Sequence, residues 1–189
     1  MFNAPKIILS SLVLAMVPAC SSELSKEEQE ILDARLADEE KPTSLTAVVQ
    51  DQPELSTATT MVGLSGIAQE LKDGGPFTAF TATNDAFNKM DADQLKDLMN
   101  PENKAELVKI AKFGLADGNM TSADIAKAIA DGGGTAEITS VEGSVIKASM
   151  NGDKIVLEDG AGNKATVIKA DIPSTNGTLH IIDTVLMPG

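Results

Sequence analysis

Residues 75–87 read GPFTAFTATNDAF, and this stretch decides how the chain folds. The segment 77–82 predicts a strand, because the glycines and the proline immediately before it end any preceding helix. Thr83 or Asn84 can then cap a short helix, and Asp85 in the first turn of that helix suits the positive end of its dipole. The stretch is therefore a strand that runs directly into a capped helix.

The spacing of apolar residues differs on the two sides of this stretch. Helical spacing governs most of the chain up to residue 131, whereas the chain after the three glycines at 132–134 alternates as strands do. Helices are expected over residues 44–50, 55–71, 85–89, 91–99, from 100 to about 114–118, and after a capping box formed by Thr121 and Asp124. Strands are expected over residues 137–141, 144–150, 154–158, 164–170 and 178–187. Helices that come first and antiparallel strands that come later, with one early strand, indicate an α+β fold.

A hairpin turn is expected where Asn151 and Gly152 join two of these strands. The Asn-Gly pair is typical of a type I′ turn, in which both central residues need a positive φ. The strands over 144–150 and 154–158 are therefore predicted to pair directly with each other.

Three segments resemble the fasciclin domain family, and they occur in the family's order. The first is the stretch 75–87, and the last is 176–188, NGTLHIIDTVLMP, which resembles the closing strand of these domains. Between them, residues 107–124 resemble the family's central helix and the segment that leaves it. The resemblance extends over residues 42–189 and implies a wedge-shaped antiparallel β-sandwich flanked by several short helices. The resemblance also implies that Asn84, Asp85, Asn176, His180 and Asp183 are structural residues of the family's motifs.

Two positions bear on how such a domain would bind a partner. Many fasciclin domains end the central helix with a Tyr-His pair, linked in some animal members to integrin binding, whereas this chain has Phe113 and Gly114 there. The resemblance also makes Asp171 and Ile172 a candidate interaction site, because some members carry a proposed adhesive Asp-Ile motif at this place. A plain structural explanation is that an aspartate before a turn hydrogen-bonds to the local backbone.

The first residues predict a lipoprotein signal peptide over 1–19. A short positive region precedes an apolar run of signal-peptide length, which is too short to span a bilayer. The run leads into VPAC at 17–20, which resembles a bacterial lipobox and makes Cys20, the single cysteine, the expected site of lipid attachment. The alternative is an ordinary signal peptide cleaved near Ala19. Because Ser21 rather than aspartate follows the cysteine, the outer membrane is the favoured destination in the bacterial cell envelope.

Residues 20–41 predict an acidic tether between the lipid and the folded domain. The segment is dense in glutamate and carries only a thin apolar stripe, so that a solvated or fraying helix is expected. A coiled coil that binds a partner is the alternative, but it would need more heptads than this length provides.

Composition and charge exclude several classes of partner. The formal net charge is −13, which argues against nucleic acid, because phosphate contacts need clustered Lys and Arg. Five Phe, no Trp and no Tyr make an aromatic platform for sugars or bases hard to build. No cofactor is expected, and the spacing of the acidic residues predicts no metal site.

The leading hypothesis is a non-enzymatic, envelope-anchored binding module that acts in cell adhesion or in another contact with a protein or an extracellular polymer. The alternative is a small-ligand or polysaccharide-binding lipoprotein, which would need a concave pocket with a few polar groups. A hydrolase is a third hypothesis, in which His180, the single histidine, would act as a base. Asp183 leaves the same strand from the opposite face and is poorly placed to orient that histidine. We therefore expect His180 to be a structural, hydrogen-bonded residue.

Overall fold

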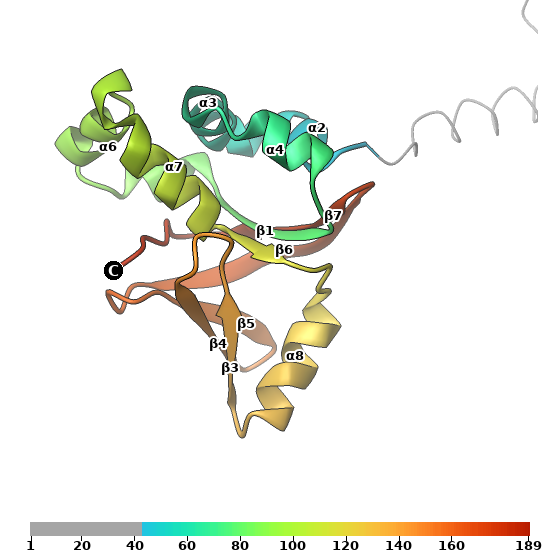
Figure 1. Ribbon diagram of the computed structural model, residues 1–189. Helices are drawn as coiled ribbons and strands as arrows, with labels where there is room; N and C mark the ends of the chain where they lie inside the picture. Colours follow the sequence, from blue (N-terminus) through green and yellow to red (C-terminus); the bar gives the residue numbers. More distant parts are fainter. Residues whose placement is uncertain (1–42) are drawn as a thin grey trace, which may run out of the picture. The chain divides into compact units, whose positions relative to one another are not determined.

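A seven-stranded sheet forms the centre of the structure, with the strands in the order β2-β1-β7-β6-β5-β4-β3. The computed structural model describes residues 43–189 (Figure 1). The strands are β1 (Phe77–Ala82), β2 (Leu115–Asp117), β3 (Thr135–Thr139), β4 (Val145–Asn151), β5 (Lys154–Glu158), β6 (Lys164–Ser174) and β7 (Gly177–Ile182). One sheet accompanied by several helices confirms the predicted α+β class.

The sheet bends at β6, which pairs with β7 on one side and with β5 on the other. The pairing of β6 with β7 shifts register twice, between Val167 and Lys169 and again between Lys169 and Ile172. Bulges of this kind bend a strand and increase its local twist. The two outer strands then meet through a bridge between Ala116 and Ser140, so that the two edges of the sheet touch.

One strand pair corrects the expectation of a wholly antiparallel sandwich. β1 and β7 pair in parallel, with Phe77 opposite Gly177 and Ala82 opposite Ile182. The other pairs of the described sheet are antiparallel. A parallel pair needs a long connection, and here α5 to α8 and β2 to β6 all lie between its two strands. Local turn signals, which report only short connections, therefore could not reveal the parallel pair.

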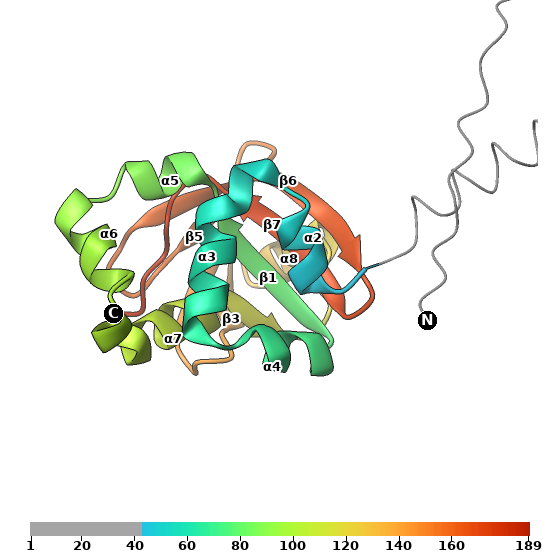
Figure 2. The same ribbon diagram turned by 90° about the horizontal axis from the view of Figure 1, so that it is seen from above.

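Helices pack on both halves of the bent sheet. They are α2 (Leu45–Gln50), α3 (Ser56–Ser65), α4 (Ala68–Asp73), α5 (Asn84–Asn88), α6 (Ala92–Leu98), α7 (Lys104–Phe113) and α8 (Ser122–Asp131), with 3-10 turns η1 (Pro53–Leu55) and η2 (Pro101–Asn103). Figures 1 and 2 show α2, α3, α4 and α7 over the half that contains β1 and β7, whereas α8 packs beside β3 and β4. Buried hydrophobic side chains form a core that extends from Leu45 to Leu186. Because this part of the chain has a core of its own, we expect residues 42–189 to fold without the tether.

Local helix signals are confirmed at α8 and partly wrong before β1. The capping box at the start of α8 is present, since the Thr121 side chain accepts from the Asp124 N–H and the Asp124 side chain accepts from the Thr121 N–H. The helix expected over 55–71 is instead divided, because Gly66 adopts a φ of +80° directly after α3. A residue with left-handed backbone ends a helix, so that α4 begins as a new one.

The hairpin between β4 and β5 forms, but its turn differs from the expected type. Asn151 pairs with Lys154, so that Gly152 and Asp153 are the central residues. Gly152 has a φ of +62° and Asp153 has no positive φ, which is the pattern of a type II′ turn rather than a type I′ turn. The short strand β2 was not expected, since its three residues follow α7 with only one glycine between them.

Within residues 43–189, no helix has the length and hydropathy that crossing a bilayer requires. The predicted signal peptide (1–19), the lipid attachment site Cys20 and the tether (20–41) lie outside the described residues. They remain predictions from the sequence.

Candidate functional site

His180 lies in the middle of β7 and is 0% exposed. Its ring stacks on Phe80 of β1 with a centroid separation of 5.5 Å and an interplanar angle of 20°. The Asp171 N–H donates to Nδ1 at 3.4 Å, and Nε2 lies 3.0 Å from the Met120 carbonyl oxygen. Because a backbone N–H can only donate, Nδ1 must accept, and the ring proton therefore lies on Nε2. Both ring nitrogens are occupied by backbone groups.

Asp171 lies in β6 within the second register shift, between Lys169 and Ile172. Its φ of +60° is the one positive value among the described residues other than glycine, and aspartate tolerates this conformation better than most side chains do. Its Oδ1 accepts from the Ser122 N–H at 2.7 Å, and its Oδ2 accepts from the Ser122 hydroxyl. Ile172, the second residue of the candidate interaction site, is half-buried against the core and pairs with Leu179. The carboxylate therefore already has a structural partner at the start of α8.

The cluster of Ser122, Asp171 and His180 has the residue types of a hydrolase triad but not its connections. In a triad the histidine bonds to the serine hydroxyl and to the aspartate carboxylate. Here the serine bonds to the carboxylate, and the histidine receives only the aspartate's backbone N–H. Since both histidine nitrogens are taken, the ring cannot accept a proton from a nucleophile without breaking a backbone contact. The geometry gives no support to the hydrolase hypothesis.

The cluster instead holds the connection between β2 and α8, residues 118–121, together with Ser122 at the start of α8. Thr78 of β1 donates from Oγ1 to the Gly118 carbonyl at 2.7 Å and accepts from the Met120 N–H at 2.9 Å. Together with the bonds from His180 to Met120 and from Asp171 to Ser122, these contacts fix the connection to β1, β6 and β7. Sequence reasoning did not identify Thr78 or Ser122, because a strand threonine and a first-turn serine carry no distinctive signal. The capping box that follows was the one local indication.

Asn176 ties the start of β7 to two helices. Its Oδ1 accepts from the Leu45 N–H at 2.8 Å, and its Nδ2 donates to the carbonyls of Leu71 and Gly74, the latter at 3.4 Å. The side chain therefore satisfies a free N–H at the start of α2 and carbonyls at the end of α4. Such terminal groups have no partner inside their own helix.

Asn84 and Thr83 resolve the alternative left open by the sequence. Thr83 caps α5, since its Oγ1 accepts from the Ala86 N–H at 3.2 Å. Asn84 does not cap α5. Its Oδ1 accepts from the Thr57 N–H at 2.9 Å, and its Nδ2 donates to the Pro53 carbonyl at 3.1 Å. Asn84 therefore fastens η1 and the start of α3 to the end of β1.

The two aspartates of the motif segments differ in their surroundings. Asp183 follows β7, and its Oδ1 accepts from the Thr166 N–H at 2.7 Å while its own N–H donates to the Thr166 carbonyl at 3.1 Å. It thereby extends the pairing of β6 with β7 by one residue. Asp85 is exposed in the first turn of α5, where a negative charge suits the helix dipole.

The place of the family's Tyr-His pair has no room for an imidazole in this backbone. Phe113 is 0% exposed, as expected for a ring that packs in the core. A Cβ on Gly114 would lie 2.9 Å from the Phe80 carbonyl oxygen, which is too close for a Cβ. This oxygen belongs to the backbone of β1 and cannot turn aside as a flexible side chain would. Any side chain at position 114 would therefore force α7 and β1 apart.

The described residues contain no group of three or more His, Cys, Asp or Glu placed to hold a metal ion. Asp171 within the cluster and Asp124 of α8 each accept hydrogen bonds at the start of α8. The hydrogen bonds from the Thr121 hydroxyl and the Thr121 N–H, and to a smaller extent the charge of Lys127, hold the pKa of Asp124 below its usual value, although desolvation acts in the opposite direction.

Asp171→Asn is expected to change how stability depends on pH. Burial raises the pKa of Asp171, but the hydrogen bonds that its carboxylate accepts from the Ser122 hydroxyl and N–H outweigh this, so that the pKa lies below its ordinary value. A lowered pKa means that the carboxylate contributes stability above the unfolded value of about 3.9 and that this contribution is lost as pH falls through the folded pKa. The unfolding free energy of the unsubstituted protein should therefore decrease more steeply below about pH 4 than that of Asp171→Asn.

Urea unfolding at a series of pH values measures this difference. The effect is expected to be small, because the carboxylate is largely exposed and solvent screens it. Curves that stay parallel through the acid range would show that the Ser122 contacts do not stabilise the charged form.

Comparisons with known proteins match one family model and several individual proteins to this chain. The family model described as the Fasciclin domain matches residues 53–188. Protein sll1483 of Synechocystis sp. is 30% identical over 180 residues, which are 95% of this chain and 92% of that protein. Periostin of Homo sapiens is 30% identical over 146 residues, which are 77% of this chain but only 16% of periostin.

Among solved structures, a FAS1 domain pair from the insect cell adhesion molecule Fasciclin I has the same fold. It aligns with a TM-score of 0.54 and 21% identity, over 69% of this chain and 43% of that chain. The polar cluster around His180 and the bridging asparagines lie inside the matched region 53–188.

Proposed function

This chain belongs to the fasciclin domain family, and from that premise we propose that it is a non-enzymatic binding module held at a bacterial cell envelope by a lipid on Cys20. Its folded domain binds another protein or an extracellular polymer and so acts in adhesion or in the organisation of the envelope. The outer membrane is the proposed location of the anchor.

One observation carries this proposal: the polar side chains of the motif segments, buried at His180 and half-buried at the other positions, bond to backbone groups. Asn84, Asn176, His180 and Asp183 each bond to main-chain groups of other elements. A catalytic histidine needs a ring nitrogen free to exchange a proton with substrate, and His180 has none. Support for adhesion comes from the solved structure with the same fold, which belongs to an insect cell adhesion molecule. Fold alone does not fix function, so this support needs a binding experiment.

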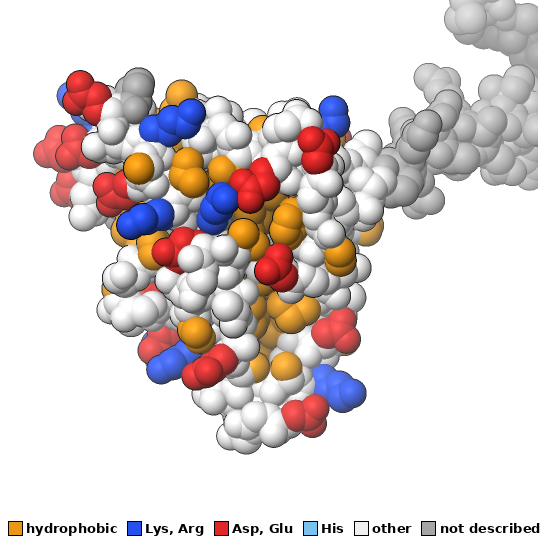
Figure 3. Space-filling view, in the orientation of Figure 1, with side chains coloured by type: hydrophobic (Ala, Val, Ile, Leu, Met, Phe, Trp, Pro, Cys, Tyr) orange, Lys and Arg blue, Asp and Glu red, His pale blue; other side chains and the backbone are white. Residues whose placement is uncertain are grey.

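The surface of the domain would bind a partner through its shape and through polar groups that are spread over it. Figure 3 shows charged side chains spread over the helices and hairpins of one face, with hydrophobic side chains gathered between α4 and α8. The chain's net charge of −13 disfavours a partner whose own binding surface is strongly negative. Interfaces of this kind bind through a central apolar area with a polar rim.

The proposal is tested with immobilised residues 42–189, exposed to detergent extracts of the native envelope and washed at low and then high salt. A discrete protein or polymer that stays bound through high salt supports the binding role and identifies the partner. Retention of nothing, or only of basic proteins that leave with salt, removes the support for a specific partner. A domain denatured before coupling to the same matrix serves as the control.

Cys20→Ser is expected to release the protein from the membrane. A thioether-linked lipid needs the cysteine sulfur, and the serine hydroxyl cannot replace it, whereas the domain itself is untouched by the change. Fractionation of cells should move essentially all of the mature chain from the membrane pellet to the soluble fraction. If the variant stays in the pellet, a feature other than the lipid holds it there.

A further inference from the structure

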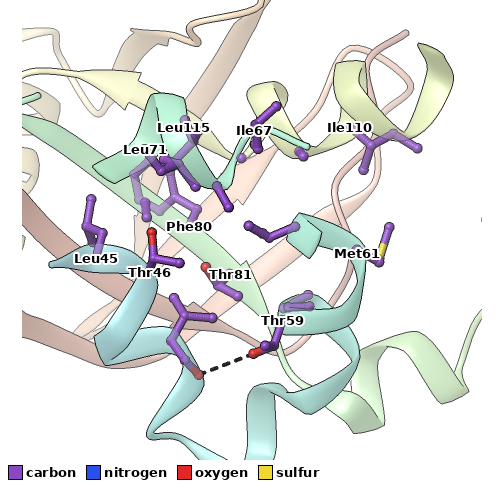
Figure 4. Close-up of a pocket in the computed structure, with 18 of the residues that line it drawn as sticks. Leu45, Thr46, Thr59, Met61, Ile67, Leu71, Phe80, Thr81, Ile110 and Leu115 are labelled. Carbon is purple, nitrogen blue, oxygen red and sulfur yellow. Dashed lines mark hydrogen bonds between the residues drawn. The ribbon is translucent and has the colours of Figure 1, made fainter. Parts of the chain in front are cut away.

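An apolar cavity of about 140 Å³ lies between helices α2, α3, α4 and α7 and strand β1 (Figure 4). Most of its wall is hydrocarbon from the core, including Leu45, Met61, Ile67, Leu71, Phe80 and Ile110. Figure 4 shows these side chains arranged around a common space, with contributions from each of the surrounding elements. Interiors of proteins are packed with few voids larger than a water molecule, so that a space of this size needs an explanation.

The wall carries one buried polar atom without a partner. Thr46 Oγ1 is the buried side-chain oxygen that has no hydrogen-bond partner among the described residues. Thr59, also in the wall, differs, since its Oγ1 donates to the Leu55 carbonyl at 3.1 Å. Figure 4 shows Thr46 and Thr81 among the side chains that line the cavity. Leaving a buried hydroxyl without a hydrogen bond is costly, and such groups are rare in native proteins.

Water is a poor occupant for this cavity. A buried water typically makes about three hydrogen bonds to polar groups around it, and the wall offers few. Cavities of about 150 Å³ lined by Leu, Ile and Phe stay dry and bind benzene or xenon. The composition of the wall therefore favours a hydrocarbon body, and the Thr46 hydroxyl favours one polar atom on it.

A path from solvent into the cavity exists beside α2 and α3. Gln50 and Gly63 both contribute to the wall, and both are exposed at the surface. A Cβ built on Gly63 meets nothing within 4 Å, which shows open space at this point of α3. The cavity is therefore partly open to solvent, and exposed residues of α2 and α3 belong to its lining.

We propose that the cavity binds a compact, mainly apolar molecule, about the size of one six-membered ring, that carries a single oxygen able to accept a hydrogen bond from the Thr46 hydroxyl. Cyclic or branched ketones and alcohols have this chemistry. The hydrocarbon body fills the apolar wall and the oxygen satisfies the unpaired hydroxyl. The site lies among core side chains and is partly open to solvent, and its ligand is a small molecule rather than a macromolecular partner.

The experiment compares two probes of the same shape, cyclohexanone and cyclohexane, titrated into isotope-labelled residues 42–189 and followed by backbone amide shifts. Both probes are expected to shift amides of α2, α3 and β1. Thr46→Val should weaken the binding of cyclohexanone roughly three- to tenfold, because it removes one hydrogen bond and keeps the shape of the side chain. The affinity for cyclohexane should stay unchanged or increase. Thr46→Ser keeps the hydroxyl and should bind both probes nearly as the unsubstituted domain does.

Thr59→Val is the matched control, because its hydroxyl lies in the same wall but is already bonded to backbone. It is expected to leave the ratio of the two affinities unchanged. Absence of cyclohexane-induced shifts in these elements would overturn the proposal, since the cavity would then be closed or filled by water. An equal loss for both probes in Thr46→Val, or the same change of ratio in Thr59→Val, would overturn the role of Thr46.

Discussion

Gly177→Ala is expected to destabilise the domain by about 3–5 kcal/mol or to prevent it from folding. A Cβ at this position would lie 1.9 Å from the Phe77 carbonyl oxygen and 2.8 Å from the Phe77 carbonyl carbon. These are backbone atoms of β1, which is held between β2 and β7, so that they cannot move aside as a flexible side chain would. The φ of Gly177, +152°, adds strain for any other residue.

Urea unfolding followed by circular dichroism measures the loss, with Gly152→Ala as the matched control. Gly152 also has a positive φ, but a Cβ there meets nothing within 4 Å. The control isolates the conformational cost, which is about 1–2 kcal/mol for a left-handed residue. Equal losses in the two variants would show that the close approach of β1 and β7 at Phe77 does not limit position 177.

His180→Ala is expected to reduce the free energy of unfolding by about 3–5 kcal/mol. The substitution leaves the Asp171 N–H and the Met120 carbonyl without partners and opens a space beside Phe80 in a region that is 0% exposed. Each buried group left unpaired costs about 1–3 kcal/mol, and the lost packing adds to this.

Asp85→Ala is the control for this prediction, because it alters another motif residue that lies at the surface. Surface substitutions of this kind usually change stability by no more than about 0.5 kcal/mol. If His180→Ala unfolds at the same urea concentration as the unsubstituted domain, then His180 is not a structural residue, and the search for a chemical role would reopen.

The sequence was sufficient for features whose signals are local. The capping box of Thr121 and Asp124, the strand 77–82 and the hairpin near Gly152 each depend on residues within a few positions of one another. The hairpin shows the limit of such signals. Its central residues are Gly152 and Asp153 rather than the expected Asn151 and Gly152, and this shift of one residue changes the turn type. A single glycine suits both turn types, and only the pairing of Asn151 with Lys154 decides between them.

The remaining features depend on contacts between distant parts of the chain. The parallel pairing of β1 with β7 joins residues about one hundred positions apart, as Phe77 and Gly177 show. The motif resemblance marked Asn176 as structural, but it could not indicate that the amide reaches Leu45, 131 residues away. Thr46 carried no signal at all, since a threonine in a short helix looks the same whether its hydroxyl faces solvent or a cavity.

The anchor and the domain have separate physical tasks in the proposed function. A lipid on Cys20 would place the domain at the membrane without help from charge, which is consistent with an acidic chain that anionic lipid would repel. The polar side chains of the domain's motif segments hold helix ends and strands together, and its surface is left for contact with a partner. Membrane attachment and partner binding should therefore be separable, so that a variant can lose one and keep the other.

Cross-linking in intact cells tests the central claim most directly, that the anchored domain holds a macromolecular partner at the envelope. The full chain, Cys20→Ser and a chain that lacks residues 42–189 would be compared after treatment with a short amine-reactive cross-linker. We predict a discrete cross-linked species that contains the full chain and one further component, that is depleted in Cys20→Ser and that is absent without the domain. Recovery of only uncross-linked chain, or of the same species without the domain, would contradict the proposed function.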